Sequence, residues 1–287
     1  MTASYSVLHL LVDGMCALAM FARFLPGGNG HLYILLYNFC AFALQMPLGV
    51  ALDALWAKEE GRLWDFPFLF AAAGVFCTIL GALTHPVVLG IGNALFHVGG
   101  GVGTIREDAA RGFQGRGLGI FVAPGALGLY LGTMSAGSVS WKACFWGTAF
   151  IATAICAWAA RGARTRSAEA RNLSRADDGF REQGGKAAKG IAAAAICCLA
   201  VVMLRSYVGL AVVFPWKSGI LAGMLAVLAV AGGKMAGGFA AARYGFVKTT
   251  LISLGLAAFG YLFSSVGFMG LAALFLYNMT MPMTLYW

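Results

Sequence analysis

The sequence predicts an all-α membrane protein of about ten transmembrane helices, and three observations lead to this fold class. Hydrophobic residues make up 60% of the 287 positions and charged residues only 11%, whereas a soluble domain carries about a quarter charged residues. The hydrophobic residues fall in long continuous runs, unlike the short alternating strands of a transmembrane β-barrel. At roughly 20 residues per span, the chain has room for about nine to eleven helices.

Turn sequences between the hydrophobic runs set the limits of the individual helices. Residues 26–30, 84–86 and 214–217 contain the glycines and prolines that favour turns at a membrane face. The ten helices that result are predicted at residues 4–25, 31–53, 66–84, 86–105, 117–138, 141–161, 190–214, 218–242, 248–266 and 267–287.

A charged segment divides these helices into two groups. Residues 162–189 are rich in Arg, Ala, Gly, Asp and Glu and contain almost no large hydrophobic residue, which is the composition of a solvated linker. Acidic residues within the segment dilute its positive charge, which favours a linker over a segment that binds nucleic acid or anionic lipid. We therefore predict a six-helix bundle at 1–161, a cytoplasmic linker at 162–189 and a C-terminal bundle of four helices at 190–287.

The distribution of positive charge predicts the orientation in the membrane. If the N-terminus is cytoplasmic, fifteen of the twenty Lys and Arg residues fall in cytoplasmic loops and three fall in outer loops, while Arg205 and Lys234 fall within helices. Membrane proteins place an excess of Lys and Arg in their cytoplasmic loops. We therefore predict a multi-pass protein of the inner (plasma) membrane with both termini in the cytoplasm. The same rule explains the net charge of +9 without a nucleic-acid partner.

Two similar motifs lie at matching places in the two groups of helices, at the junction of the second helix with the third. Each motif begins with a glycine and keeps a different part of one longer pattern. The motif residues are Gly49, Asp53 and Lys58 in the first group and Gly238, Arg243 and Gly245 in the second. Both motifs resemble the signature loop of the major facilitator superfamily, G-x-L-x-D-R-x-G-R-[RK], which recurs in degenerate form in the second half of that family. The first motif departs from it at Ala54 and Trp56, and the second at Ala242.

The fifth and fourth predicted helices add to this resemblance. Gly119, Pro124, Gly125 and Gly128 are similar to the Gly/Pro pattern of antiporter members, and residues 92–97 resemble efflux proteins of the fosmidomycin-resistance type. The resemblance implies two pseudo-symmetric halves that rock around a cavity lined by helices 1, 4, 7 and 10, with the motif residues at a cytoplasmic gate. Members usually have twelve helices, so it also implies that the last two helices are missing from this chain.

Ionisable residues within the predicted helices are candidates for a functional site, because such groups are costly in a bilayer and usually face a cavity or a partner. His9 and Asp13 are four residues apart and therefore share one face of the first helix. Asp13 is the only acidic residue that we place in the hydrocarbon region. Burial favours the protonated carboxyl unless a cation pairs with it, so Asp13 is our candidate for proton coupling. The competing interpretation is a structural pair of Asp13 with His9 or Arg205.

The other polar residues of the predicted helices are weaker candidates. Asn93 and His97 form a second pair spaced by four residues, and His97 is either a titrating or substrate-contacting group or a packed, hydrogen-bonded histidine. Arg205 either pairs with Asp13 or binds an anionic group of a substrate. The remaining candidates for substrate contact, which could equally join helices to one another, are Gln45, Lys234 and Asn278.

Together these observations predict a secondary transporter that moves a small organic solute by proton-coupled efflux. We expect it to act as a monomer and to be neither an enzyme nor a protein that needs a cofactor or a resident metal. His9, Asp13 and His97 could instead hold zinc in an intramembrane metalloenzyme, although the sequence contains no H-E-x-x-H motif and offers no candidate base. A third interpretation is a non-transporting fragment of a transporter.

Overall fold

The computed structural model describes residues 1–58, 65–162 and 212–286. Within these ranges the regular secondary structure is helical, and eight of the helices are long and apolar enough to cross a membrane. The described chain is therefore that of a multi-pass helical membrane protein. Nearly all of the predicted linker at 162–189, most of the predicted helix at 190–214, and Arg205 lie outside the described residues, so the count of ten helices stays a prediction.

Each of the first two spans contains a π-helical segment. The first span consists of α1 (Thr2–Ala19) and η1 (Met20–Phe24), and the second of α2 (Gly30–Asn38), η2 (Phe39–Ala43) and α3 (Gln45–Lys58). The predicted helices at 4–25 and 31–53 therefore each correspond to one span. A π-helical turn adds a residue to the helical repeat and often lies near a functional site.

Four more helices follow before the linker. They are α4 (Phe66–Leu83), α5 (Pro86–Arg111), α6 (Arg116–Ala136) and α7 (Trp141–Arg161). The limits of α4, α6 and α7 lie close to those predicted, but α5 extends beyond the predicted limit at residue 105. Its charged last turn remains helical, and the helix ends at Gly112, whose φ of 66° is typical of a glycine cap.

The part of the chain after the linker contributes four described helices. They are α10 (Gly219–Tyr244), α11 (Phe246–Leu262), α12 (Gly267–Asn278) and α13 (Met281–Tyr286). Gly245 alone joins α10 to α11 with a φ of 90°, a conformation that glycine adopts without strain. The predicted helix at 267–287 is broken after Asn278, because Pro282 has no N–H to donate to the Asn278 carbonyl.

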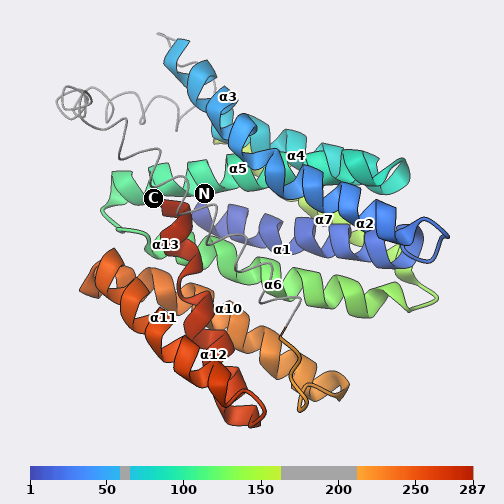
Figure 1. Ribbon diagram of the computed structural model, residues 1–287. Coiled ribbons are helices and arrows are strands. Elements are labelled where there is room, and N and C mark those ends of the chain that lie inside the picture. Colours follow the sequence, from blue (N-terminus) through green and yellow to red (C-terminus); the bar gives the residue numbers. More distant parts are fainter. Residues whose placement is uncertain (59–64, 163–211, 287) are drawn as a thin grey trace.

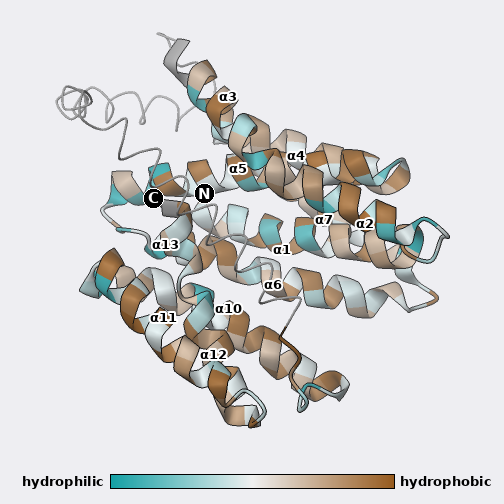
Figure 2. Cartoon of the chain, in the orientation of Figure 1, coloured by the Kyte–Doolittle hydropathy of each residue, from teal (hydrophilic) through white to brown (hydrophobic). Residues whose placement is uncertain are grey.

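The outer surface of the bundle is hydrophobic. Large apolar side chains are exposed along α2, α3, α7, α10 and α11, and Phe150 of α7, for example, is 75% exposed. Figure 2 shows hydrophobic segments running along the helices and hydrophilic residues at many of the turns between them. Soluble monomers rarely expose apolar areas of this extent, so these faces are suited to contact with lipid.

Close packing of α1 on α6 organises the N-terminal part of the chain (Figure 1). A Cβ atom on Gly128 would press against the carbonyl group of Leu10, and one on Gly132 against the carbonyl oxygen of Gly14. Such small residues let two helix backbones approach closely in a membrane. α10 packs on the same helix α6, so α6 lies between α1 and the part of the chain that follows the linker.

The two motif glycines have different surroundings. Gly49 has open space beside it, whereas a Cβ atom on Gly238 would lie 2.9 Å from the Cα of Gly119 on α6. Asp53 pairs with Arg106 of α5 at 3.9 Å and is largely exposed, and Arg243 is exposed beside the ring of Tyr244. The side chain of Lys58 lies outside the described residues. The pseudo-symmetry of the two groups of helices therefore stays a prediction.

The N-terminus lies beside the C-terminal end of α5. The ammonium group of Met1 is 3.2 Å from the Glu107 carboxylate, and the backbone N–H of Thr2 donates to the same carboxylate at 2.6 Å. The next carboxylate, Asp108, accepts hydrogen bonds from the first N–H groups of α6, at Gly117 and Leu118. One end of α5 thus fixes the starts of both α1 and α6, which are the two helices that frame the site described below.

The α1–α6 contact predicts a specific sensitivity to an added methyl group. Gly128→Ala should lower the free energy of unfolding by about 1–3 kcal/mol, because the new Cβ meets backbone atoms that cannot move aside. Gly147→Ala is the matched control, since Gly147 is exposed within α7 with no atom near its Cβ position. The control should be neutral or stabilising by up to about 1 kcal/mol. Equal melting temperatures in detergent for the two variants would contradict the packing.

Candidate functional site

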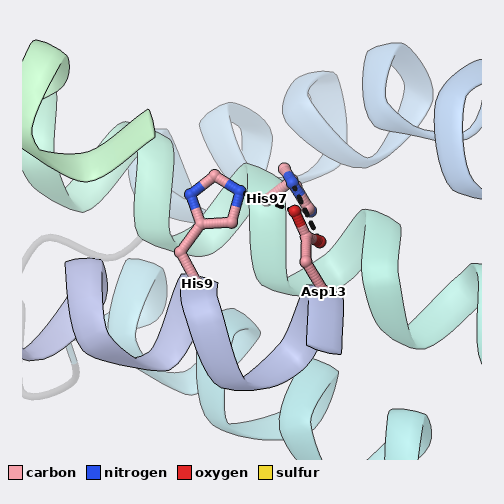
Figure 3. Close-up of side chains that lie close together, drawn as sticks. All are labelled: His9, Asp13 and His97. Atoms are coloured by element: carbon pink, nitrogen blue, oxygen red, sulfur yellow. Dashed lines mark ion pairs between the residues drawn. The ribbon is translucent and has the colours of Figure 1, made fainter. Parts of the chain in front are cut away.

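Three ionisable side chains from two helices meet inside the bundle. His9 and Asp13 come from α1 and His97 from α5, and Figure 3 shows the three side chains close together. The Nε2 atom of His9 is 3.2 Å from Oδ2 of Asp13, and the Nε2 atom of His97 is 3.7 Å from Oδ1 of the same carboxylate. The two imidazole rings are 4.6 Å apart and nearly perpendicular. We call these three residues the His–Asp–His cluster.

The cluster lies deep in the bundle and near the middle of its helices. His9 and Asp13 are 3% and 6% exposed, and Asp13 lies at the centre of the span Thr2–Phe24. The rings of Phe96 and Phe121 pack against His9 with centroid distances of 5.9 and 4.7 Å. The His97 side chain is 22% exposed, so it is the member of the cluster that is most accessible from outside.

Backbone carbonyl groups fix the tautomers of both histidines. The Nδ1 atom of His9 lies 2.8 Å from the carbonyl oxygen of Phe121, and the Nδ1 atom of His97 lies 2.9 Å from that of Asn93. A carbonyl oxygen can only accept a hydrogen bond, so both Nδ1 atoms must carry the hydrogen. In the neutral form of each ring, the Nε2 atom then has no hydrogen and presents a lone pair to Asp13.

This arrangement leaves the cluster short of positive charge. Asp13 already accepts a hydrogen bond from the Asn93 amide at 3.1 Å. If Asp13 is ionised and both rings are neutral, two nitrogen lone pairs face the oxygens of a carboxylate, and the three side chains together carry a charge of −1. One added proton converts the contact of Asp13 with His9 into a hydrogen bond and makes the three side chains neutral. The geometry therefore favours a proton or another cation between the rings and the carboxylate.

Helix α6 supplies two features that sequence reasoning did not assign to the site. One is the carbonyl oxygen of Phe121, which holds the His9 ring. The other is Gly125, where a Cβ atom would press on Nε2 of His9 and lie 2.6 Å from Oδ2 of Asp13. Gly125 belongs to the Gly/Pro pattern noted in the sequence, so the sequence did mark this position. The sequence cannot mark the Phe121 carbonyl in this way, because every residue has a backbone carbonyl and its partner depends on how the helices pack.

The remaining residues proposed from the sequence do not all join the cluster. The charge of Lys234 on α10 acts on both Asp13 and His97. Gln45 donates a hydrogen bond to the carbonyl of Ala41, in the η2 segment of its own span. Asn278 likewise donates to Leu274. Of the described candidates, the structure thus brings together His9, Asp13, Asn93 and His97, with Lys234 acting through its charge. Arg205 lies outside the described residues, so its pairing with Asp13 stays a prediction.

The same three ligand atoms could hold a metal ion. One atom from each of His9, Asp13 and His97 can be chosen so that all three lie within 4.8 Å of one another. Two imidazole nitrogens and a carboxylate are a ligand set that binds zinc and related metals. The sequence analysis expected no resident metal, and the structure adds a geometry in which such an ion could bind.

The tautomers predict how Asp13 variants affect stability. Asp13→Asn should change the free energy of unfolding by less than about 1 kcal/mol, because the new amide can accept from Asn93 and donate to Nε2 of His9. Asp13→Leu removes these partners and should cost about 1–3 kcal/mol for each buried polar group left without one. Thermal unfolding in detergent measures both. A collapse of the Asp13→Asn variant would instead indicate an essential buried ion pair.

Comparisons with known proteins give the chain no family. The sequence matches no protein-family model, and it matches no curated protein. The resemblance to the major facilitator superfamily therefore rests on the sequence motifs alone.

Proposed function

We propose that this chain is a secondary active transporter that works by alternating access, with the His–Asp–His cluster as its central ion-binding site. The observation that supports this most strongly is the geometry of the cluster. Three ionisable groups converge at the middle of apolar spans, and their tautomers present two nitrogen lone pairs and a carboxylate to a cation. Ionisable groups inside a membrane are by default candidates for ion or substrate pathways.

A purely structural pair would need fewer groups than the cluster contains. One cation beside Asp13 would neutralise it, but the structure has two imidazoles around one carboxylate, each held by a hydrogen bond at its far nitrogen. Such preorganisation is characteristic of a site whose geometry matters for binding. The occupant is exchangeable in our proposal, and protons are the simplest coupling ion. When the last proton leaves, the three side chains of the cluster carry one negative charge. The electrostatic energy of the bundle therefore differs between the protonated and the unprotonated cluster.

The packing offers a way for the occupancy of the cluster to affect the rest of the protein. α6 contacts the cluster through Phe121 and Gly125. The same helix also packs on α10. Lys234 on α10 interacts electrostatically with Asp13 and His97. A change of charge in the cluster therefore changes a force between the helices before and after the linker. In alternating access, two bundles move relative to each other around a fixed site.

The finer parts of the proposal come from the sequence. The resemblance to the major facilitator superfamily supports a solute carrier of the plasma membrane, with a cytoplasmic N-terminus, that exports a small organic solute as a monomer. Asp53 and its ion pair with Arg106 are at the place where that family has its cytoplasmic gate. We prefer this function to an intramembrane metalloenzyme, because the sequence contains no H-E-x-x-H motif.

The proposal predicts the effect of Asp13→Asn on ion-coupled transport. With the purified chain in lipid vesicles that carry a pH gradient, some members of a panel of small organic solutes should dissipate the gradient, as reported by an entrapped pH-sensitive dye. Asp13→Asn should reduce this dissipation to the rate of vesicles without protein, because the amide cannot take up and release a proton.

A matched control separates this effect from general damage. His31→Gln replaces an exposed histidine on α2, away from the cluster, and should dissipate the gradient at the native rate. Solute-dependent dissipation by Asp13→Asn at the native rate would contradict the assignment of the cluster as the coupling site. The stability measurement described above shows whether a loss of activity reflects a loss of folding.

A further inference from the structure

We infer that the His–Asp–His cluster binds a divalent first-row transition-metal ion and that this ion is a solute which the protein carries. The inference rests on the proposed function for its transport step and on the geometry of the cluster for its binding step. It differs from the small organic solute expected from the sequence, because the observations below concern the donor atoms themselves.

The spacing of the donor atoms is close to that of a metal site. Donor atoms about 2.1 Å from a tetrahedral metal lie about 3.4 Å from one another. Nε2 of His9 and Oδ2 of Asp13 are 3.2 Å apart, and Nε2 of His97 and Oδ1 of Asp13 are 3.7 Å apart. All three ligand atoms lie within 4.8 Å of one another. Small rotations of the side chains would therefore complete a three-ligand site.

Each ligand is also oriented by a second hydrogen bond. Histidines that bind metals almost always donate their other ring N–H to a carbonyl or carboxylate oxygen. His9 does so to the carbonyl of Phe121 and His97 to that of Asn93. The carboxylate of Asp13 accepts from the Asn93 amide. The two unprotonated Nε2 atoms are thus preset as ligands, whereas the opposite tautomers would have to rearrange before a metal could bind.

The donor set selects the class of metal. Imidazole nitrogen favours Zn²⁺, Co²⁺, Ni²⁺ and Fe²⁺, whereas Mg²⁺ and Ca²⁺ are held by oxygen ligands. Three protein ligands leave at least one coordination position for water or an exchanging group, as in sites that are not purely structural. A Cβ atom on Gly125 would clash with Nε2 of His9 and Oδ2 of Asp13, so a glycine at this position is what lets α6 pack closely against these two ligand atoms.

A direct test is the binding of Co²⁺, whose visible absorption reports coordination, to the full purified chain in detergent. The chain contains four histidines, so a background with His31→Gln and His85→Asn leaves only the two of the cluster. Asparagine suits position 85, because His85 caps the N-terminus of α5. We expect one Co²⁺ per chain, displaced by Zn²⁺ but not by excess Mg²⁺.

Adding His97→Gln to this background should weaken Co²⁺ binding by at least about tenfold, the size of effect typical of changes around a metal site. A chain that binds no Co²⁺, or whose binding and spectrum survive His97→Gln, would overturn the inference. Dissipation of a pH gradient by an organic solute would then still support the proposed transporter. Conversely, Co²⁺ binding at the cluster by a protein that transports no solute and no metal in vesicles would retain the site and remove the transport function.

Discussion

Two hydrogen bonds from imidazole N–H groups to backbone carbonyls determine what the centre of this protein can bind. They place the hydrogen of His9 and of His97 on Nδ1 and so direct both Nε2 lone pairs toward Asp13. The alternative tautomers would let each neutral ring donate to the carboxylate, and this hydrogen-bonded network would keep the negative charge of Asp13 but offer no nitrogen lone pair to a cation. The positions of these two carbonyl oxygens therefore make the cluster a site that favours a positive ion.

Those carbonyl oxygens are positioned by helix packing. Phe121 reaches His9 because α6 approaches α1 closely at Gly125, Gly128 and Gly132. The Asn93 carbonyl reaches His97 within α5 itself, four residues away. Pro124 lies between Phe121 and Gly125 and cannot donate to the carbonyl of Ile120, so the hydrogen-bond ladder of α6 lacks one bond beside the site. Gly125 and Gly128, which belong to the pattern that resembles a family, thus have a local role in forming the cluster.

The sequence predicted the membrane class and most helix limits, because continuous hydrophobic runs and turn residues leave few alternatives. It also identified His9 with Asp13 and Asn93 with His97, since a spacing of four residues fixes the face within one helix. Residue spacing alone could not show that the two pairs meet, because that depends on which helices are neighbours. Only the family resemblance placed the first and fourth helices around one cavity, where Asp13 and His97 were expected to converge. The sequence analysis missed the break after Asn278 and the extension of α5 to Arg111. The first depends on Pro282 and the second on Gly112, and neither depends on hydrophobicity.

The most direct measurement of the central claim is the nitrogen NMR spectrum of the chain labelled with ¹⁵N-histidine, in the background with His31→Gln and His85→Asn. Only the two cluster histidines contribute to that spectrum. The structure predicts that both rings keep a protonated Nδ1 at every pH where the protein is folded, and that only the Nε2 signals respond to protons or to added Zn²⁺. A neutral ring with its hydrogen on Nε2, at either histidine, would contradict the account.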